Sequence, residues 1–450
     1  MGSKTVIFFG AGTTKYCGVP LTNDQTDMFQ AYFFEDDNAF KKYLKEKMSV
    51  LKDEDAETLL KLKEDAKIQQ LIEFVKVMFL KEGFVMMSFY DLIDMAVSER
   101  RGFFAPNNKE YTVEQLKQFR NSILVVLQTV FALLEKNILK NKTDDFNKLK
   151  KFFKDIAKAE LDKRIEHIIS VDMQSKDFIF TDVEYLSTNW DVLILWAMML
   201  AHKELNNENS RYLSDKQGIY KLKVFNDFFA YLNSKDINDS DDKDWFPYNQ
   251  TVAYRLNDTD HISDKRVILF PTYFPHGQTH WLECPVCGKM TMYIDSKFKT
   301  YTHGFEMRCD QEYKCSHCNK KLSLENSAML LQTNYKIKSP SLEQIQRSMR
   351  VALNNCDRII FIGYSLPSDD VEYNSLLRIS NANKKEAYVV LYVDNGENRF
   401  VSADEASKKC DKDTEEIIKR FTNIFGKENV KVNLAGFPNV ASEVIELLRE

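Results

Sequence analysis

Short apolar runs alternate with helical patterns at both ends of this 450-residue chain, and this alternation constrains the fold more than any other feature. The first run, at 5–12, reads TVIFFGAG and predicts a buried strand that enters a glycine turn. Further strands are predicted at 178–188, 267–274, 358–366, 387–396 and 429–435, and helices at 190–205, 341–355, 403–425 and 441–449. Strands that alternate with helices pair in parallel, with helices on both faces. We therefore predict an α/β fold with a doubly wound, Rossmann-like parallel sheet.

A long helical pattern interrupts this alternation. Over 25–175, apolar residues recur at three- and four-residue spacing among Lys and Glu, as they do in amphipathic helices. We predict that this segment is a helical insertion, and that 1–24 and 176–450 together form the domain around the sheet. Such an insertion either builds an oligomer or partner interface, which we favour, or only packs on the core.

Composition excludes several classes of protein. With 44% hydrophobic and 29% charged residues, the chain can bury a sizeable core and is not a disordered chain. Its formal net charge of -5 argues against a general nucleic-acid binder, which is more often basic. The longest apolar stretches, 122–134 and 192–201, are too short for a bilayer and predict buried helices. No secretory signal is expected, so we predict a soluble, cytoplasmic protein without a membrane span.

Four of the eight cysteines form the most specific motif in the sequence. Cys284-x-x-Cys287 and Cys315-x-x-Cys318 are two CxxC pairs with 27 residues between them. Four thiolates at this spacing suit a tetrahedral, structural zinc ion, within a zinc module predicted at 280–325. Three nearby side chains are alternative ligands: His303, Cys309 and His317. A redox-active CxxC pair is the less favoured interpretation.

Two glycine turns follow predicted strands. At 10–14 (GAGTT), backbone N–H groups and a helix N-terminus can meet a dinucleotide pyrophosphate. The GxGxxG pattern is incomplete, because Lys15 stands in place of its third glycine. At 363–366 (GYSL), a glycine and a hydroxyl side chain suit contact with phosphate or ribose. Either segment can also be an ordinary turn.

Two further segments place polar side chains at strand ends. The segment 187–191 (STNWD) lies where ligands meet a doubly wound sheet, although Thr, Asn and Asp also suit a cap of the following helix. His276-Gly277 follows the strand at 267–274. A lone His is more often structural than catalytic, but the Gly beside it permits a close backbone approach.

Taken in chain order, these motifs resemble the sirtuin family. Sirtuins carry GAGxS followed by GIP, and here 10–14 is followed by GVP at 18–20. The family's TQNxD resembles 187–191, its catalytic His-Gly resembles 276–277, and its GTSL loop resembles 363–366. The paired CxxC motifs resemble its zinc module. GYSLP followed by Asp369 and Asp370 is more similar to the bacterial sirtuin-like branch than to the deacylases.

The resemblance implies that NAD is the substrate and that zinc is structural. Asn189 would sit near the nicotinamide ribose and help to position water, Asp191 would hold the nicotinamide carboxamide, and His276 would act as a base toward a ribose hydroxyl. The other implied NAD contacts are Gly10, Ala11, Gly12, Thr13 and Thr14 at the pyrophosphate, Gly363 and Ser365 on the adenosine side, and Asp394 and Asn395 at the adenine ribose.

The sequence departs from the deacylases directly after Pro20. Deacylases follow GIP with Asp-Phe-Arg, and that Phe covers the reactive sugar carbon; here Leu21, Thr22 and Asn23 stand at those positions. Because Thr22 is smaller and polar, we predict that water reaches the sugar carbon and that the protein is an NAD glycohydrolase. Protein deacylation is the alternative among enzymes. A non-catalytic NAD or ADP-ribose sensor and a zinc-ribbon nucleic-acid binder are the alternatives from other classes.

Bacterial sirtuin-like proteins of this shape resemble toxic effectors of anti-phage abortive infection. The resemblance implies a homo-oligomer with a regulatory protein partner, such as an ATPase or a nucleotide-processing subunit. An enzyme that depletes NAD must be held off until it is triggered, and assembly is one means of control. Direct binding of nucleic acid is not expected.

Overall fold

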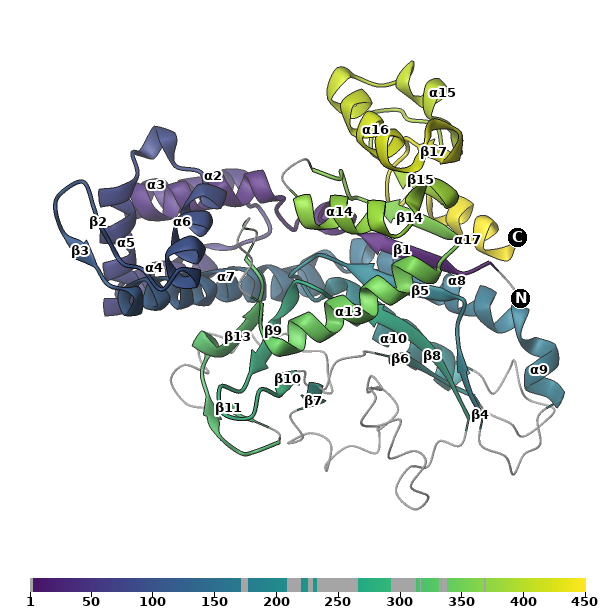
Figure 1. Ribbon diagram of the computed structural model, residues 1–450, viewed down its shortest axis with the longest axis horizontal. Coiled ribbons are helices and arrows are strands. Elements are labelled where there is room, and N and C mark those ends of the chain that lie inside the picture. Colours follow the sequence, from purple (N-terminus) through teal and green to yellow (C-terminus); the bar gives the residue numbers. More distant parts are fainter. Residues whose placement is uncertain are drawn as a thin grey trace.

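The computed structural model describes residues 3–170, 177–208, 220–225, 230–232, 266–292, 313–315, 317–331, 333, 338–367 and 370–450. Within these residues, a nine-stranded sheet forms the centre of the molecule (Figure 1). Its strands are β1 (Thr5–Phe9), β4 (Asp177–Phe180), β5 (Val183–Ser187), β6 (Lys221–Phe225), β8 (Arg266–Tyr273), β14 (Arg358–Ile362), β15 (Glu386–Val390), β16 (Val401–Ser402) and β17 (Val430–Asn433).

The strand order is β16-β17-β15-β14-β1-β5-β8, and both β4 and β6 pair with β8. Every pair is parallel except that of β16 with β17. From β1 the chain first builds the β5 and β8 side and then returns to β14 on the other side of β1. The direction of winding therefore reverses between β1 and β14, and such a switch point is where doubly wound sheets bind ligands.

The helices that follow β5 in the chain alternate with these strands. They are α10 (Leu193–Glu208), α13 (Pro340–Asn355), α14 (Val371–Ile379), α15 (Ala403–Ser407), α16 (Lys412–Phe425) and α17 (Ala441–Arg449). The short helix α1 (Gly12–Lys15) follows β1 directly.

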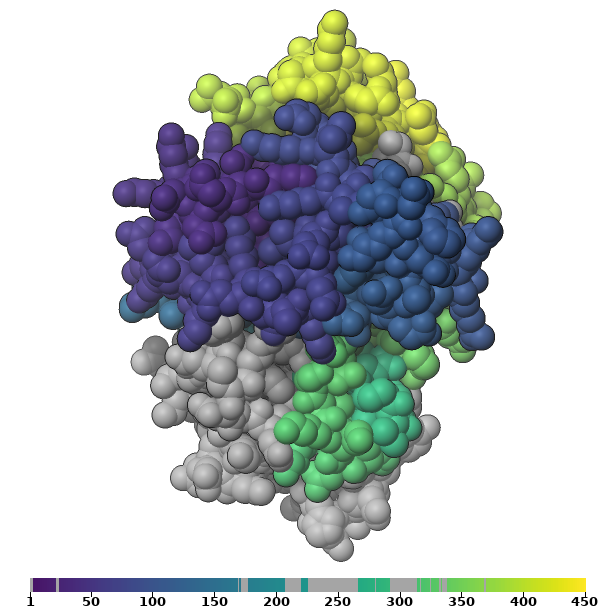
Figure 2. Space-filling model, turned by 90° about the vertical axis from the view of Figure 1, so that its left-hand side faces the viewer, coloured from purple at the N-terminus to yellow at the C-terminus, as the bar shows by residue number. Residues whose placement is uncertain are grey.

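Between α1 and β4 the described residues are almost wholly helical, and α2–α7 extend to one side of the sheet, whereas α8 and α9 lie toward the other (Figure 1). Its elements are α2 (Thr22–Phe34), α3 (Asp37–Lys47), α4 (Asp53–Lys63), α5 (Ala66–Met78), η1 (Lys81–Gly83), α6 (Met86–Ser98), the hairpin of β2 (Phe103–Phe104) and β3 (Glu110–Tyr111), α7 (Val113–Asn141), α8 (Thr143–Lys163) and α9 (Ile165–Ser170). Side-chain caps begin several of these helices; for example, the Asp36 carboxylate accepts the Ala39 N–H at 2.9 Å. Figure 2 shows the face at the left of Figure 1, where the purple to blue residues of α2–α7 form a continuous layer.

Both faces of the sheet are covered. Neighbouring side chains of β1 point to opposite faces, so the contacts of Phe9 and Phe8 show what covers each face. Phe9 packs against Phe153 of α8, with ring centroids 5.5 Å apart. Phe8 stacks on Tyr364, 4.4 Å away, and meets the edge of Tyr373 of α14 at 5.8 Å. The predicted α/β fold with a doubly wound parallel sheet is confirmed.

A smaller sheet lies beside the main one and has the order β13-β9-β10-β7. Its strands are β7 (Ala230–Leu232), β9 (Gly277–Glu283), β10 (Met290–Met292) and β13 (Ser327–Met329), the last preceded by η3 (Leu324–Asn326). A separate hairpin pairs β11 (Tyr313–Lys314) with β12 (Lys321–Leu322).

The helix α7 is the one described helix that is long and apolar enough to cross a membrane, and 83% of its most apolar window is buried inside the protein. It contacts α5 and α6 on the outside and β9, β13 and η3 on the inside. The apolar stretch predicted at 122–134 thus lies within a buried helix, as predicted.

The predicted strands and helices of the sheet are present, but several bounds differ. The strands predicted at 358–366 and 387–396 end at Ile362 and Val390, before the turns that follow them. The strand predicted at 178–188 is interrupted at Thr181, between β4 and β5. The helix predicted at 403–425 is two helices, because Asp411 begins α16 by accepting the Thr414 N–H at 2.8 Å. The division into 1–24 with 176–450 and 25–175 stays a prediction, as does the module at 280–325.

Candidate active site

The turn after β1 and the turn after β14 pack backbone against backbone. The Gly12 N–H donates to the Gly363 carbonyl at 2.9 Å, and the Gly10 N–H donates to the Ile362 carbonyl at 2.9 Å. A Cβ on Gly10 would lie 2.5 Å from the Gly363 oxygen, and one on Gly363, whose φ is +64°, would lie 2.2 Å from the Thr13 nitrogen. These glycines are therefore needed where two turns meet at the switch point, a reason that local sequence did not reveal.

Thr14 links the turn after β1 to the turn after β5. Its hydroxyl donates to Asp191 Oδ2 at 3.0 Å and accepts from Asn189 Nδ2 at 3.2 Å. Asp191 Oδ1 accepts the Leu193 N–H at 3.1 Å, at the start of α10. Asp191 thus caps a helix, as the second interpretation of 187–191 predicts, and it also joins this cluster; its role toward a ligand stays a prediction.

Asn189 is 5% exposed, and its side-chain oxygen has no hydrogen-bond partner among the described residues. A buried acceptor without a partner costs about 1–3 kcal/mol, so such atoms in native proteins usually meet water or a ligand. The Asn189 side chain is therefore held at its nitrogen by Thr14, while its oxygen can accept a further hydrogen bond.

His276 reaches the same turn from the end of β8. Its Nδ1 lies 3.2 Å from the Thr188 carbonyl oxygen, and its ring meets the edge of Tyr373 at 5.4 Å. Because a carbonyl only accepts, this contact places the proton of the neutral ring on Nδ1 and the lone pair on Nε2. Gly277 has φ +70°, and a Cβ there would lie 1.6 Å from the Ala328 carbonyl oxygen, so the Gly beside His276 is required by the pairing of β9 with β13.

Burial sets the electrostatics of this cluster. It raises the pKa of Asp191 to about 6, against the opposing effect of the Thr14 hydrogen bond. Close by, burial and the charge of Asp191 raise the pKa of Glu135 well above its usual value. At neutral pH, Asp191 is therefore mostly ionised, while the surroundings of Glu135 favour its uncharged form.

The remaining predicted NAD-contacting residues lie further out. Ala11 and Ser365 are half-buried in the two facing turns, and Asp394 and Asn395 are exposed in the loop after β15. The Asp394 carboxylate accepts the Tyr392 hydroxyl at 2.9 Å. The structure brings the turns after β1, β5, β8 and β14 together, whereas no contact joins Asp394 or Asn395 to them.

Glu135 is the residue of this region that sequence reasoning missed. It lies on α7, and its Oε1 accepts the Val192 N–H at 3.0 Å, directly after Asp191. An indication was present in the sequence, because Gln128 lies within the apolar run at 122–134 and Glu135 follows it at a spacing of two helical turns. Amphipathic periodicity alone assigned the helix correctly but did not show which polar side chains face the sheet.

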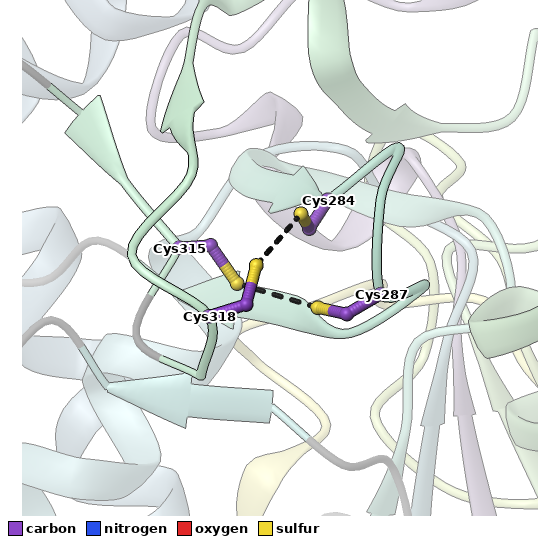
Figure 3. Close-up of side chains that lie close together, drawn as sticks. All are labelled: Cys284, Cys287, Cys315 and Cys318. Carbon is purple, nitrogen blue, oxygen red and sulfur yellow. Dashed lines mark hydrogen bonds between the residues drawn. The ribbon is translucent and has the colours of Figure 1, made fainter.

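The four predicted zinc ligands converge (Figure 3). The sulfur atoms of Cys284 and Cys318 are 3.5 Å apart, those of Cys287 and Cys315 are 3.6 Å apart, and all four lie within 4.8 Å of one another. A tetrahedral zinc ion with ordinary Zn–S bonds places its sulfur ligands about 3.8 Å apart, so these thiolates fit zinc. The site is closed by four protein ligands, as in structural zinc sites.

The two cysteine pairs have the same backbone shape. Gly288 and Asn319, each one residue past the second cysteine of its pair, have φ of +64° and +63°. The N–H of each donates to the carbonyl of the first cysteine in its pair at 2.9 Å. Equal turns of this kind aim both pairs of sulfur atoms at one point.

Several predicted positions lie outside the described residues. They are His303 and Cys309, named as alternative zinc ligands, and Asp369, which follows the GYSLP motif. The backbones of Thr22 and Asn23 begin α2, but their side chains also lie outside the described part.

No family model matches this chain, and no curated protein matches it. Its fold is similar to that of solved structures of Sir2 enzymes. One, from work on the mechanism and regulation of Sir2 enzymes, is 11% identical, with 100% of this chain and 94% of that chain covered and a TM-score of 0.32. A complex of a Sir2 homologue with NAD is 12% identical, with 99% and 88% covered and a TM-score of 0.32. Sir2Tm bound to a propionylated peptide is 11% identical, with 86% and 80% covered and a TM-score of 0.27.

Proposed function

We propose that this protein is a sirtuin-like enzyme that consumes NAD, and that it hydrolyses the bond between nicotinamide and ribose. The observation that carries the proposal is the convergence of Thr14, Asn189, Asp191 and His276 at the switch point of the sheet. The motifs at 10–14, 187–191, 276–277 and 363–366 resemble those of sirtuins in their order, and the last of them supplies the turn that packs on Gly10 and Gly12.

The chemistry fits the residues of this cluster. When the nicotinamide–ribose bond breaks, its electron pair leaves with nicotinamide, and positive charge develops on the sugar. An ionised Asp191 stabilises that charge and can accept hydrogen bonds from the carboxamide group. The Asn189 oxygen, which lacks a partner among the described residues, is suited to orient the attacking water.

Water supplies the new bond to the sugar carbon, and one of its protons must leave. His276 Nε2 carries the lone pair of the neutral ring and is suited to accept that proton, or one from a ribose hydroxyl. The products are ADP-ribose, nicotinamide and one proton. The hydrolytic outcome rests on Thr22, which replaces the bulky Phe of the deacylase motif.

Release of nicotinamide from NAD by the purified protein tests this proposal. Asn189→Ala and His276→Ala should each lower the rate by about 100-fold or more, as loss of a positioned polar group or base does. Asn107→Ala and His167→Ala are matched controls on the exposed surface, and both should keep the wild-type rate.

An acetylated peptide offered together with NAD separates hydrolysis from deacylation. Hydrolysis gives ADP-ribose whether or not the peptide is present. Deacetylated peptide without free ADP-ribose would contradict the hydrolase proposal. Tight NAD binding without any turnover would instead favour a sensor.

We further propose that the enzyme is a cytoplasmic effector of bacterial anti-phage defence, assembled as a homo-oligomer and controlled by a protein partner. The GYSLP motif and the large helical region support this assignment. Co-purification from cells with and without phage infection, followed by measurement of cellular NAD, tests it: NAD should fall only after infection.

A further inference from the structure

Two polar side chains of α7 contact the segments beside the candidate active site. Gln128 and Glu135 are seven residues apart, which places them on one face of the helix. They are 4% and 3% exposed. Most of the buried residues of α7 are apolar, so these two side chains are polar groups retained inside a core.

Both side chains hold the same residue of β9, Thr279. Gln128 donates to the Thr279 carbonyl at 2.8 Å and to the Ser327 hydroxyl at 3.0 Å. The Thr279 hydroxyl donates to Glu135 Oε1 at 3.3 Å. Thr279 is thereby fixed from α7 at its main chain and at its side chain.

Thr279 and Glu135 in turn hold the segment that carries the proposed catalytic residues. The Thr279 N–H donates to the Trp190 carbonyl at 3.1 Å, and the Val192 N–H donates to Glu135 Oε1 at 3.0 Å. These two contacts flank Asp191 on both sides. The backbone on one side of Asp191 is therefore held directly by α7, and on the other side through β9. The Asp191 carboxylate is held by Thr14 and the Leu193 N–H.

We propose that Glu135 is a positioning residue through which the helical insertion sets the geometry, and hence the rate, of the active site. The proposal deepens the function given above and rests on it. A shift of α7, caused by assembly or by a partner seated on the insertion, moves the backbone on either side of Asp191 without any contact with NAD. Glu135 itself acts through Asp191 and does not meet the substrate.

The contacts of Glu135 agree with this role. Its Oε1 accepts both the Val192 N–H and the Thr279 hydroxyl, and burial together with the charge of Asp191 raises the pKa of this carboxyl. A glutamine side chain has the same shape and keeps that acceptor oxygen. Alanine removes it and leaves the Val192 N–H buried without its partner.

The test compares Glu135→Gln, Glu135→Ala and Asn137→Ala in nicotinamide release from NAD. Asn137 is the matched control: it lies on the same helix but bonds Asp55 of α4, away from the site. Glu135→Ala should lower kcat by about tenfold or more, since small misplacements of a catalytic group are costly. Glu135→Gln should restore kcat to within about threefold of wild type, and Asn137→Ala should lower Tm while kcat is kept. Equal loss in both Glu135 variants, or no loss in Glu135→Ala, would overturn the proposal.

A second measurement does not depend on turnover. Amide hydrogen exchange of a peptide that spans 188–195 should rise in Glu135→Ala and stay at the wild-type level in Glu135→Gln and Asn137→Ala. Unchanged exchange in Glu135→Ala would overturn the positioning role. If the wild type releases no nicotinamide while exchange behaves as expected, the proposed function fails and the positioning role of Glu135 stands.

Discussion

The helices between β1 and β4 fall into two groups that differ in what they pack against. The outer helices α2–α6 pack chiefly on one another and on the outside of α7, through aromatic contacts such as Phe33 with Phe89, 6.3 Å apart. The inner helices α7 and α8 pack against the sheets, with Phe153 of α8 on Phe9 of β1 and Glu135 of α7 on Val192. One continuous helical pattern thus contains both an outlying bundle and part of the active-site scaffold.

The length of an insertion therefore says little about how far its helices lie from the proposed catalytic residues. Apart from the first turn of α2, which begins with Thr22, we expect the outer helices to tolerate changes in packing without moving a residue of the site. Inner helices cannot, because their side chains complete the core beneath β1 and the hydrogen bonds around Asp191. Variants that change the outer helices and leave the inner helices intact, or the reverse, test this difference.

Removal of zinc should have the largest effect, because structural zinc sites contribute much of the stability of their modules. The strands β9 and β13 on the inner side of α7 lie beside the cysteine hairpins, so the inner helices should loosen while α2–α6 keep their structure. Metal analysis should find about one zinc ion per chain in wild type, and none in Cys315→Ser. Cys410→Ser, outside the cluster, is the control. Full metal content in Cys315→Ser would contradict the assigned ligands.

Phe153→Ala and Phe33→Ala compare the two groups directly. Both side chains are fully buried, so each change should lower the free energy of unfolding by about 3–5 kcal/mol. Phe153→Ala should also lower kcat for NAD, because it leaves a cavity beneath Phe9 and the turn at Gly10. Phe33→Ala should keep the kcat of the folded fraction. If Phe33→Ala lowers kcat as much as Phe153→Ala does, the distinction between outer and inner helices is wrong.

The pH dependence of the rate should be the mildest of these effects. Because burial raises the pKa of Asp191 to about 6, its carboxylate is fully charged only above that pH. The rate should rise through about pH 6, with a loss of about tenfold one pH unit below it. Since the folded state binds this proton more tightly than the unfolded chain, the contribution of Asp191 to stability is greatest in acid and is lost as the pH rises through about 6.

Two variants test whether the charge of Asp191 causes this pH dependence. Asp191→Asn should remove the rise in rate near pH 6, and Phe33→Ala in the outer helices should leave the midpoint where it is in wild type. A wild-type profile that is flat between pH 5 and pH 7 would show that the charge of Asp191 is not used.

Sequence patterns alone predicted most strands of the main sheet, most of the helices and the zinc ligands. They did not predict β6, β16 or the strands of the smaller sheet. Each of the predicted features depends on local pattern: the period of apolar residues, or two cysteines two residues apart in a turn of fixed shape. The order of the motifs also pointed to the turns after β1, β5, β8 and β14, because parallel strands place their carboxyl ends at one edge.

Which polar residues of the helical insertion lie beside the site follows only from the tertiary contacts. Glu135 meets Val192 across 57 residues of chain and Thr279 across 144, and Gly10 meets Gly363 through packing of two distant turns. No local pattern records such pairs, because the helical period shows which face of a helix is buried but not which element buries it.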